Sequence, residues 1–88
     1  MELTDLPNIG PVLAEHLRRA DIPTAGELRR VGPEEAWLRI RTRVDPGACF
    51  HQLTALAGAA AGIPKRQLPP ERKAELRAFF QSFQKINE

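Results

Sequence analysis

The chain has 88 residues, the length of one domain, and we treat residues 1–88 as a single unit. A hydrophobic fraction of 42% and a charged fraction of 27% suit a soluble globular protein and exclude a disordered chain. The formal net charge is only +2, with the basic excess in the second half, which is a weak indication of an anionic partner.

The sequence lacks the features of secreted, membrane and disulfide-bonded proteins. No apolar stretch approaches the ~20 residues that span a bilayer. The first residues are acidic where a signal peptide is positively charged, so we expect a cytoplasmic protein without membrane contact. Cys49 is the single cysteine; it cannot form an internal disulfide, and we expect it to be a small buried hydrophobe.

The apolar residues have helical spacing throughout, and no segment has the alternation of a strand. We therefore expect an all-α fold of five short helices in one compact domain. After a short lead-in at residues 3–6 and a turn at 7–10, Pro11 occupies the usual first position of a helix. This helix is expected to end at Ala20.

Thr24 and Glu27 have the spacing of a capping box, so the second helix should begin at Ala25. Gly32 ends it, and Pro33 opens the third helix, with acidic residues in its first turn where the helix dipole favours them.

Asp45 followed by Pro46 repeats the helix-start signal and predicts a fourth helix over Pro46–Ala61, with Gly62 as the residue that ends it. Residues 57–62, "AGAAAG", lack bulky side chains. We expect this part of the helix to let a neighbouring backbone approach closely.

The last helix should begin at Pro70 and present Leu76 and three phenylalanines. Phe79 and Phe80 are adjacent and diverge by roughly 100° on a helix. Either one of the phenylalanine rings projects outward, or the helix covers the core with a wide apolar face.

Residues 6–12 combine a tight turn with the start of a helix. Small turn residues let an anion approach the backbone, and the helix dipole adds partial positive charge at the same point. Ile9 should point inward and anchor the turn. Such a turn would hold a phosphate without a basic side chain; the alternative is a plain corner between two helices.

The same stretch resembles the helix-hairpin-helix motif of DNA-binding proteins, which has the pattern L-P-G-h-G-P-x-x-A. The matching residues are Leu6, Pro7, Ile9, Gly10, Pro11 and Ala14. Asn8 replaces the first glycine, although asparagine tolerates the left-handed conformation better than most residues. Val12 and Leu13 stand where the motif often has a Lys, Ser or Thr that adds a phosphate contact.

Further short matches recur in order along the chain: Leu6–Gly10, Ile22, Thr24, Glu27, Leu28, Gly32, Glu35, Ala36, Arg39–Arg41, Asp45, Pro46, Ala48, Cys49, Leu53, Ala55, Leu56, Gly58, Ala59, Gly62, Ile63, Leu68, Pro69, Lys73, Glu75 and Leu76. In this order and spacing they resemble the C-terminal domain of the TfoX/Sxy competence regulators. The departures are Asp21 at a usual glycine, Thr54 at a frequent aromatic residue and Ala57 at a common glutamate.

The resemblance implies an all-α domain with helix-hairpin-helix character and a role in natural transformation, as a positive regulator of competence genes. It also implies a partner at promoters, a cyclic-AMP receptor protein. The full-length regulators have an additional N-terminal domain, so we expect this chain to be a free-standing version of their C-terminal half.

Our first hypothesis is a regulatory module that binds duplex DNA without reading its sequence. Backbone N–H groups in the turn would hold one phosphate, and exposed basic side chains would hold its neighbours. The candidate residues are Asn8, Ile9, Gly10, Val12, Arg18, Arg19, Arg29, Arg30, Lys65 and Arg66. For the arginines, the competing interpretation is an ordinary solvated helix surface.

The second hypothesis is a protein-interaction module, either a homodimer or a domain that binds a transcription regulator. Its candidate surface consists of Trp37, Phe80 and Phe83, although tryptophan is more often a core residue.

An enzyme is the weakest hypothesis. His16 and His51 have no cysteine or carboxylate at a convincing ligand or catalytic spacing, and no nucleophile or phosphate-loop motif is present. We expect no catalytic residue, no metal and no cofactor.

Overall fold

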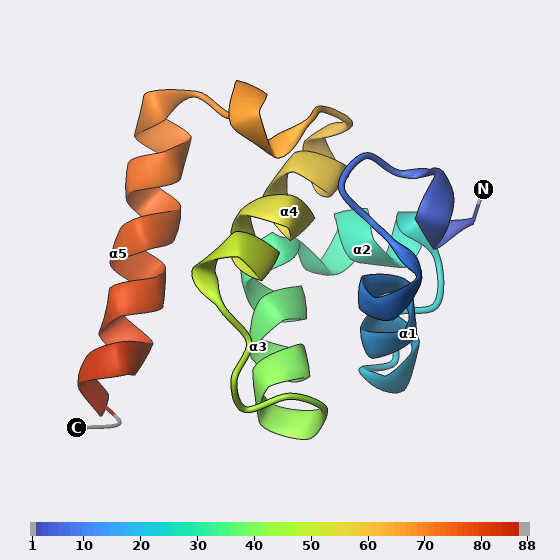
Figure 1. The fold of residues 1–88 in the computed structure, drawn as a ribbon, viewed down its shortest axis with the longest axis horizontal. Helices are drawn as coiled ribbons and strands as arrows, with labels where there is room; N and C mark the ends of the chain where they lie inside the picture. Colours follow the sequence, from blue (N-terminus) through green and yellow to red (C-terminus); the bar gives the residue numbers. More distant parts are fainter. Residues whose placement is uncertain (1, 87–88) are drawn as a thin grey trace.

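The computed structural model describes residues 2–86, with side chains as far as residue 83. The elements in chain order are η1 (Leu3–Asp5), α1 (Pro11–Arg19), α2 (Ala25–Val31), α3 (Pro33–Arg43), α4 (Phe50–Ala61), η2 (Lys65–Gln67) and α5 (Pro70–Ile86), where η denotes a 3-10 helix (Figure 1). Residues 2–86 contain five α-helices and no strand, so the predicted fold class is confirmed.

Proline marks the first residue of three helices, as predicted. The helices α1, α3 and α5 begin at Pro11, Pro33 and Pro70, where the missing N–H of proline has no helical acceptor to lose. The helix α2 begins after Thr24, whose Oγ1 accepts a hydrogen bond from the Glu27 N–H at 3.1 Å. This bond is one half of the predicted capping box.

Glycine ends two of the helices. Gly32, with φ of 85°, separates α2 from α3, and Gly62 ends α4 in the left-handed conformation, with φ of 77° and ψ of 25°. Glycine adopts this conformation without the clash that a Cβ causes. Both positions were predicted as helix ends, while α1 ends at Arg19, one residue before the predicted Ala20.

The predicted start of the fourth helix is wrong, because α4 begins at Phe50 rather than at Pro46. The Asp45 carboxylate accepts a hydrogen bond from the Gly47 N–H at 2.9 Å, which closes a tight turn instead of capping a helix.

Cys49 is exposed, which corrects the expectation that it is buried. It is the residue before α4, and its backbone is extended, with φ of −100° and ψ of 171°. Its carbonyl oxygen accepts a hydrogen bond from Nε1 of Trp37 at 3.2 Å. The backbone of Cys49 therefore takes part in the interior, and its side chain does not.

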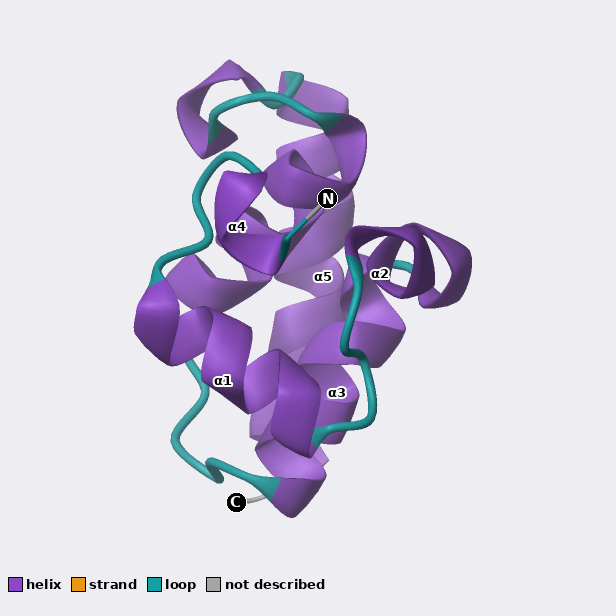
Figure 2. Ribbon diagram, turned by 90° about the vertical axis from the view of Figure 1, so that its right-hand side faces the viewer, coloured by secondary structure: helices purple, strands orange, loops and turns teal. Residues whose placement is uncertain are grey.

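The helix α4 lies at the centre of the fold and contacts α2, α3, α5 and η2. Every residue from Leu53 to Ala59 is buried, as expected for a helix surrounded by others. The helices α1 and α5 lie on opposite sides of the molecule (Figures 1 and 2). Within residues 2–86, neither α4 nor any other helix is long and apolar enough to cross a membrane.

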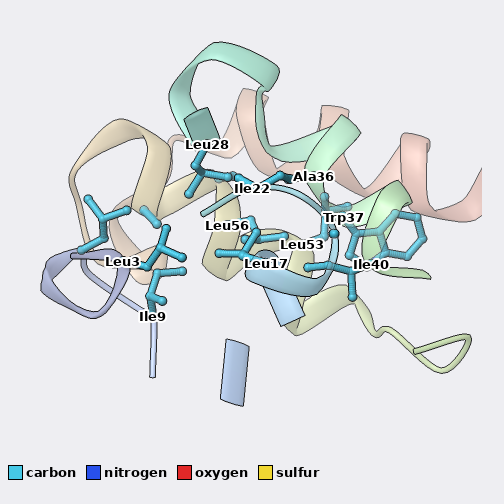
Figure 3. Close-up of a cluster of buried hydrophobic side chains, with 14 of the residues drawn as sticks. Leu3, Ile9, Leu17, Ile22, Leu28, Ala36, Trp37, Ile40, Leu53 and Leu56 are labelled. Atoms are coloured by element: carbon cyan, nitrogen blue, oxygen red, sulfur yellow. The ribbon is translucent and has the colours of Figure 1, made fainter. Parts of the chain in front are cut away.

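Most of the buried hydrophobic side chains form one cluster. At one end Leu3 and Ile9 pack beneath the turn that precedes α1, and Trp37 and Ile40 lie at the other end (Figure 3). Ile9 is 6% exposed, so the prediction that it points inward is confirmed.

All three phenylalanines of α5 pack against Trp37. Its ring centroid lies 5.9 Å from that of Phe79, 5.5 Å from that of Phe80 and 5.9 Å from that of Phe83. These spacings are typical of favourable aromatic pairs. The structure therefore has the wide apolar face, and no phenylalanine ring projects outward in this helix as far as residue 83.

Candidate functional site

The turn before α1 has the backbone that a tight hairpin requires. Asn8 adopts φ of 70°, in the left-handed region that asparagine tolerates. Gly10 is extended, with φ of −91° and ψ of −179°, and is the N-cap of α1. The buried Ile9 side chain fixes the turn to the core from below.

The Asn8 side chain reaches across to a distant part of the chain. Its Nδ2 donates hydrogen bonds to the carbonyl oxygens of Ala55, at 3.3 Å, and Ile63, at 3.1 Å. Its Oδ1 accepts a hydrogen bond from the Lys65 N–H at 3.1 Å. The turn is thereby attached to α4 and to the start of η2.

Gly58 makes this contact possible. A Cβ at position 58 would lie 2.5 Å from Nδ2 of Asn8 and 2.7 Å from the Ile63 carbonyl oxygen. The prediction that this small-residue part of α4 allows a close backbone approach is confirmed, and the residues that approach are Asn8, Ile63 and Lys65.

Several backbone N–H groups at the hairpin lack an acceptor. The first turn of α1 has no side-chain cap, and an N–H in the first turn of a helix has no partner within it. Within residues 2–86, the N–H groups of Asn8, Gly10 and Val12 make no hydrogen bond. The Ile9 N–H, by contrast, donates to the Leu6 carbonyl at 3.4 Å, so it is already engaged.

Two unpaired cations lie beside this turn. Lys65 and Arg66 form the first two residues of η2, and both side chains are exposed. Neither makes an ion pair with any acidic group in residues 2–86. The hydrogen bond from the Lys65 N–H to Asn8 holds η2 next to the hairpin. The structure thus brings together two candidate groups that are more than 50 residues apart in sequence.

The other four candidate arginines lie at the C-terminal ends of two helices. Arg18 and Arg19 are in the last turn of α1, the end opposite the hairpin, and Arg29 and Arg30 are in the last turn of α2. Cations at these helix ends complement the helix dipole.

Two of these arginines are also paired with glutamates of their own helices. Arg18 lies 3.4 Å from Glu15, and Arg30 lies 2.7 Å from Glu27. The hydrogen bond with Arg30 lowers the pKa of Glu27 and keeps that carboxylate charged beside it. The charges of Arg18 and Arg30 are thus already compensated.

The candidate surface of Trp37, Phe80 and Phe83 does not exist as an exposed patch. Trp37 is 0% exposed, and the two phenylalanine rings are half-buried against it. The large ring of Trp37 therefore belongs to the core and not to a binding surface.

Neither histidine belongs to a cluster of ligand-type side chains among the described residues. Within residues 2–86, no group of three His, Cys, Asp or Glu side chains is close enough to hold a metal ion. His51 is exposed, and His16 is half-buried in α1. The part of the chain that the structure describes has no pocket that could enclose a small molecule.

The sequence did not reveal the role of the Asn8 side chain. The local pattern presents Asn8 only as a substitute for glycine in the turn backbone. The small residues around Gly58 were the one available signal, because they indicated that something approaches α4 closely. Nothing local identified Asn8 as that residue, since Lys65 is 57 positions away.

The comparisons with known proteins agree with this fold. Residues 1–80 match the family model of the TfoX C-terminal domain. A crystal structure of an uncharacterized Listeria monocytogenes protein is 44% identical, with a TM-score of 0.93 over 96% of this chain and 94% of that one.

A second crystal structure, of a protein of unknown function from Listeria monocytogenes, is 46% identical. Its TM-score is 0.89 over 92% of this chain and 98% of that one. No curated protein gives a significant match. The family match covers nearly the whole chain, and solved structures of high identity have the same fold, so the chain belongs to the TfoX C-terminal domain family.

Proposed function

We propose that this domain is a non-enzymatic regulatory module that holds the phosphate backbone of duplex DNA. The N–H groups of Gly10 and Val12 would bind one phosphate at the start of α1. The side chains of Lys65 and Arg66 would bind a neighbouring phosphate.

The observation that supports this proposal most is the 3.1 Å hydrogen bond from the Lys65 N–H to the Asn8 side chain. It puts two unpaired cations beside the turn that leads into the uncapped N-terminus of α1. Oriented N–H groups and cationic side chains are the two usual donors to phosphate oxygens.

Contacts of this kind position a protein on DNA but carry no sequence information. Membership of the family suggests a link to competence gene regulation. In that role, the choice of promoter would come from a second protein, such as a sequence-specific transcription regulator bound to the same DNA. With two cations at the site, we expect weak binding, with a Kd on the order of 10⁻⁴–10⁻⁶ M at physiological salt.

The test is fluorescence anisotropy of a labelled duplex at a series of salt concentrations. The Gly10→Val variant should fold, because a Cβ at this position meets no atom within 4 Å. We expect a valine side chain beside the Gly10 N–H to crowd a bound phosphate and to weaken binding about tenfold, through loss of hydrogen bonds to a charged group.

Removal of both cations, with Lys65→Ala and Arg66→Ala, should lower the log–log salt slope by about 1 per residue. The matched control is Lys73→Ala, which removes the same kind of exposed charge from α5. Wild-type protein that does not bind DNA at ~100 μM and low salt, where non-specific binders register, would contradict the proposal.

A protein-interaction module is the second candidate, and the exposure of Val12 favours it. Val12 is 70% exposed, and it is the one large exposed hydrophobic residue among those the structure describes. A homodimer formed through this residue would appear in sedimentation equilibrium and would be lost in Val12→Ser. A monomer at high concentration would leave only a different protein as the partner.

A further inference from the structure

The backbone of the hairpin turn does not explain why residue 8 is an asparagine. With φ of 70°, a glycine would satisfy the turn with no side chain at all. Asn8 instead uses its amide for three hydrogen bonds, each to a backbone group between 47 and 57 positions away. The side chain must therefore be explained by what it connects.

These three bonds are the complete polar link between the turn and the α4–η2 region. Within residues 2–86, no backbone–backbone hydrogen bond joins residues 6–12 to residues 55–67. Each side-chain hydrogen bond between the two segments passes through Asn8. Without this amide, the hairpin and η2 would be neighbours without a hydrogen bond between them.

The amide is also fixed in one orientation. Its NH₂ group faces the carbonyl oxygens of Ala55 and Ile63, and its oxygen faces the N–H of Lys65. Rotation by 180° would place donor against donor and acceptor against acceptor, so the partners determine which atom is which. Gly58 of α4 lies tightly against the amide, because a Cβ at this position would be 2.5 Å from Nδ2.

We infer that Asn8 is a positioning residue, which fixes Lys65 and Arg66 relative to the hairpin N–H groups so that both hold one phosphodiester backbone as a single site. This inference rests on the proposed function. Asn8 acts here through its side chain, whose three hydrogen bonds are all made to the protein itself, and the phosphate would contact the groups that it aligns.

The test is a double-mutant cycle measured as DNA affinity. The first change is Asn8→Gly, which keeps the turn conformation and the backbone N–H and removes all three side-chain bonds. The second change is Lys65→Ala together with Arg66→Ala. Affinity is measured for wild type, each change alone and both combined, with folding checked by circular dichroism.

If Asn8 aligns the hairpin N–H groups with the two cations, removal of Lys65 and Arg66 should cost less DNA affinity once the Asn8 side chain is gone. Removal of the two cations lowers the affinity by some factor in each background. We expect this factor to be at least about threefold smaller in the Asn8→Gly background than in the wild-type background, as for coupled sites. The control is Lys73→Ala, whose effect should be the same in both backgrounds. A general loosening of the fold would change the effect of Lys73→Ala as well as the effect of the cation removal. Coupling through Asn8 would change only the effect of the cation removal.

Equal effects of the cation removal in both backgrounds would overturn the inference and leave the proposed function standing. Absence of salt-sensitive binding by the wild-type protein would overturn both. If Asn8→Gly does not fold, the cycle is repeated with Gly58→Ala, whose Cβ would crowd the same amide, the Ile63 carbonyl oxygen and the Lys65 backbone from the α4 side, and which removes no phosphate-binding group.

Discussion

Arg72, in the first turn of α5, donates two hydrogen bonds to the carboxylate of Glu34, in the first turn of α3. The donor–acceptor distances are 2.7 Å and 3.0 Å. The two side chains are 31% and 32% exposed, and a paired geometry of this kind is stronger than an ordinary surface ion pair. The pair attaches the beginning of α5 to α3, and the phenylalanines attach the turns that follow.

This pair predicts a dependence of stability on pH. The hydrogen bond from Arg72 lowers the pKa of Glu34. A carboxylate whose pKa is lower in the folded state stabilises the fold above its unfolded pKa of about 4.3 and loses this contribution as the pH falls through the folded value. We therefore expect Glu34→Gln to lower the free energy of unfolding by about 1 kcal/mol at neutral pH.

Urea denaturation at pH 7 and pH 3 measures this difference. The gap between wild type and Glu34→Gln should shrink at the lower pH, because pH 3 lies below the unfolded pKa of Glu34, where the contribution of its charge to stability is being lost. Glu71→Gln, an exposed acidic position in the first turn of α5, is the matched control and should have a small effect at both values. A gap that is the same at pH 3 and pH 7 would contradict the role of the charge.

Two identical substitutions should have opposite effects on stability. Glycine to alanine within a helix usually stabilises by about 1 kcal/mol. At Gly26 the new Cβ has 3.9 Å to its nearest neighbour, so Gly26→Ala should follow this rule. At Gly58 the Cβ would lie 2.7 Å from the Ile63 carbonyl oxygen, so Gly58→Ala should destabilise by about 1–3 kcal/mol, as overpacking does. Thermal denaturation of the two variants gives the sign directly.

Asp21 predicts a difference between two replacements of the same residue. Its φ is 63°, and its carboxylate lies 3.6 Å from Arg43 in an exposed pair. Asp21→Gly and Asp21→Ala both remove that pair, but only glycine adopts a positive φ without strain. The glycine variant should be more stable than the alanine variant by about 1–2 kcal/mol, measured by urea denaturation. Equal stability of the two variants would show that the backbone at this position relaxes.

The sequence predicted the helices well because their boundaries depend on local chemistry. Proline starts a helix at Pro11, Pro33 and Pro70. Glycine ends one at Gly32 and Gly62. The start of α4 was missed because an aspartate before a proline suits either a helix start or a tight turn. The local sequence is compatible with either structure. In the folded chain the Asp45 carboxylate accepts a hydrogen bond from the Gly47 N–H and closes the turn.

Two departures from glycine, Asn8 in the helix-hairpin-helix motif and Asp21 in the family pattern, have a backbone explanation. Asn8 and Asp21 are the two non-glycine residues with positive φ among those the structure describes. Both asparagine and aspartate tolerate this conformation, so the turns are kept.

The candidate site itself could be predicted only in part. The hairpin has a local pattern, but the place of Lys65 and Arg66 beside it depends on a tertiary contact to Asn8. The burial of Trp37 likewise depends on the packing of α5 against α3, which no nearby residue reveals.

The most direct test of the central claim is a titration of ¹⁵N-labelled protein with a short DNA duplex at low salt, followed by amide chemical shifts. If the hairpin and η2 form one phosphate-binding site, a single binding curve should describe the amide chemical shifts of Gly10, Val12, Lys65 and Arg66. The amide chemical shift of Lys73 on α5 should not change. No shift at these amides, or shifts confined to α2 or α5, would contradict the claim.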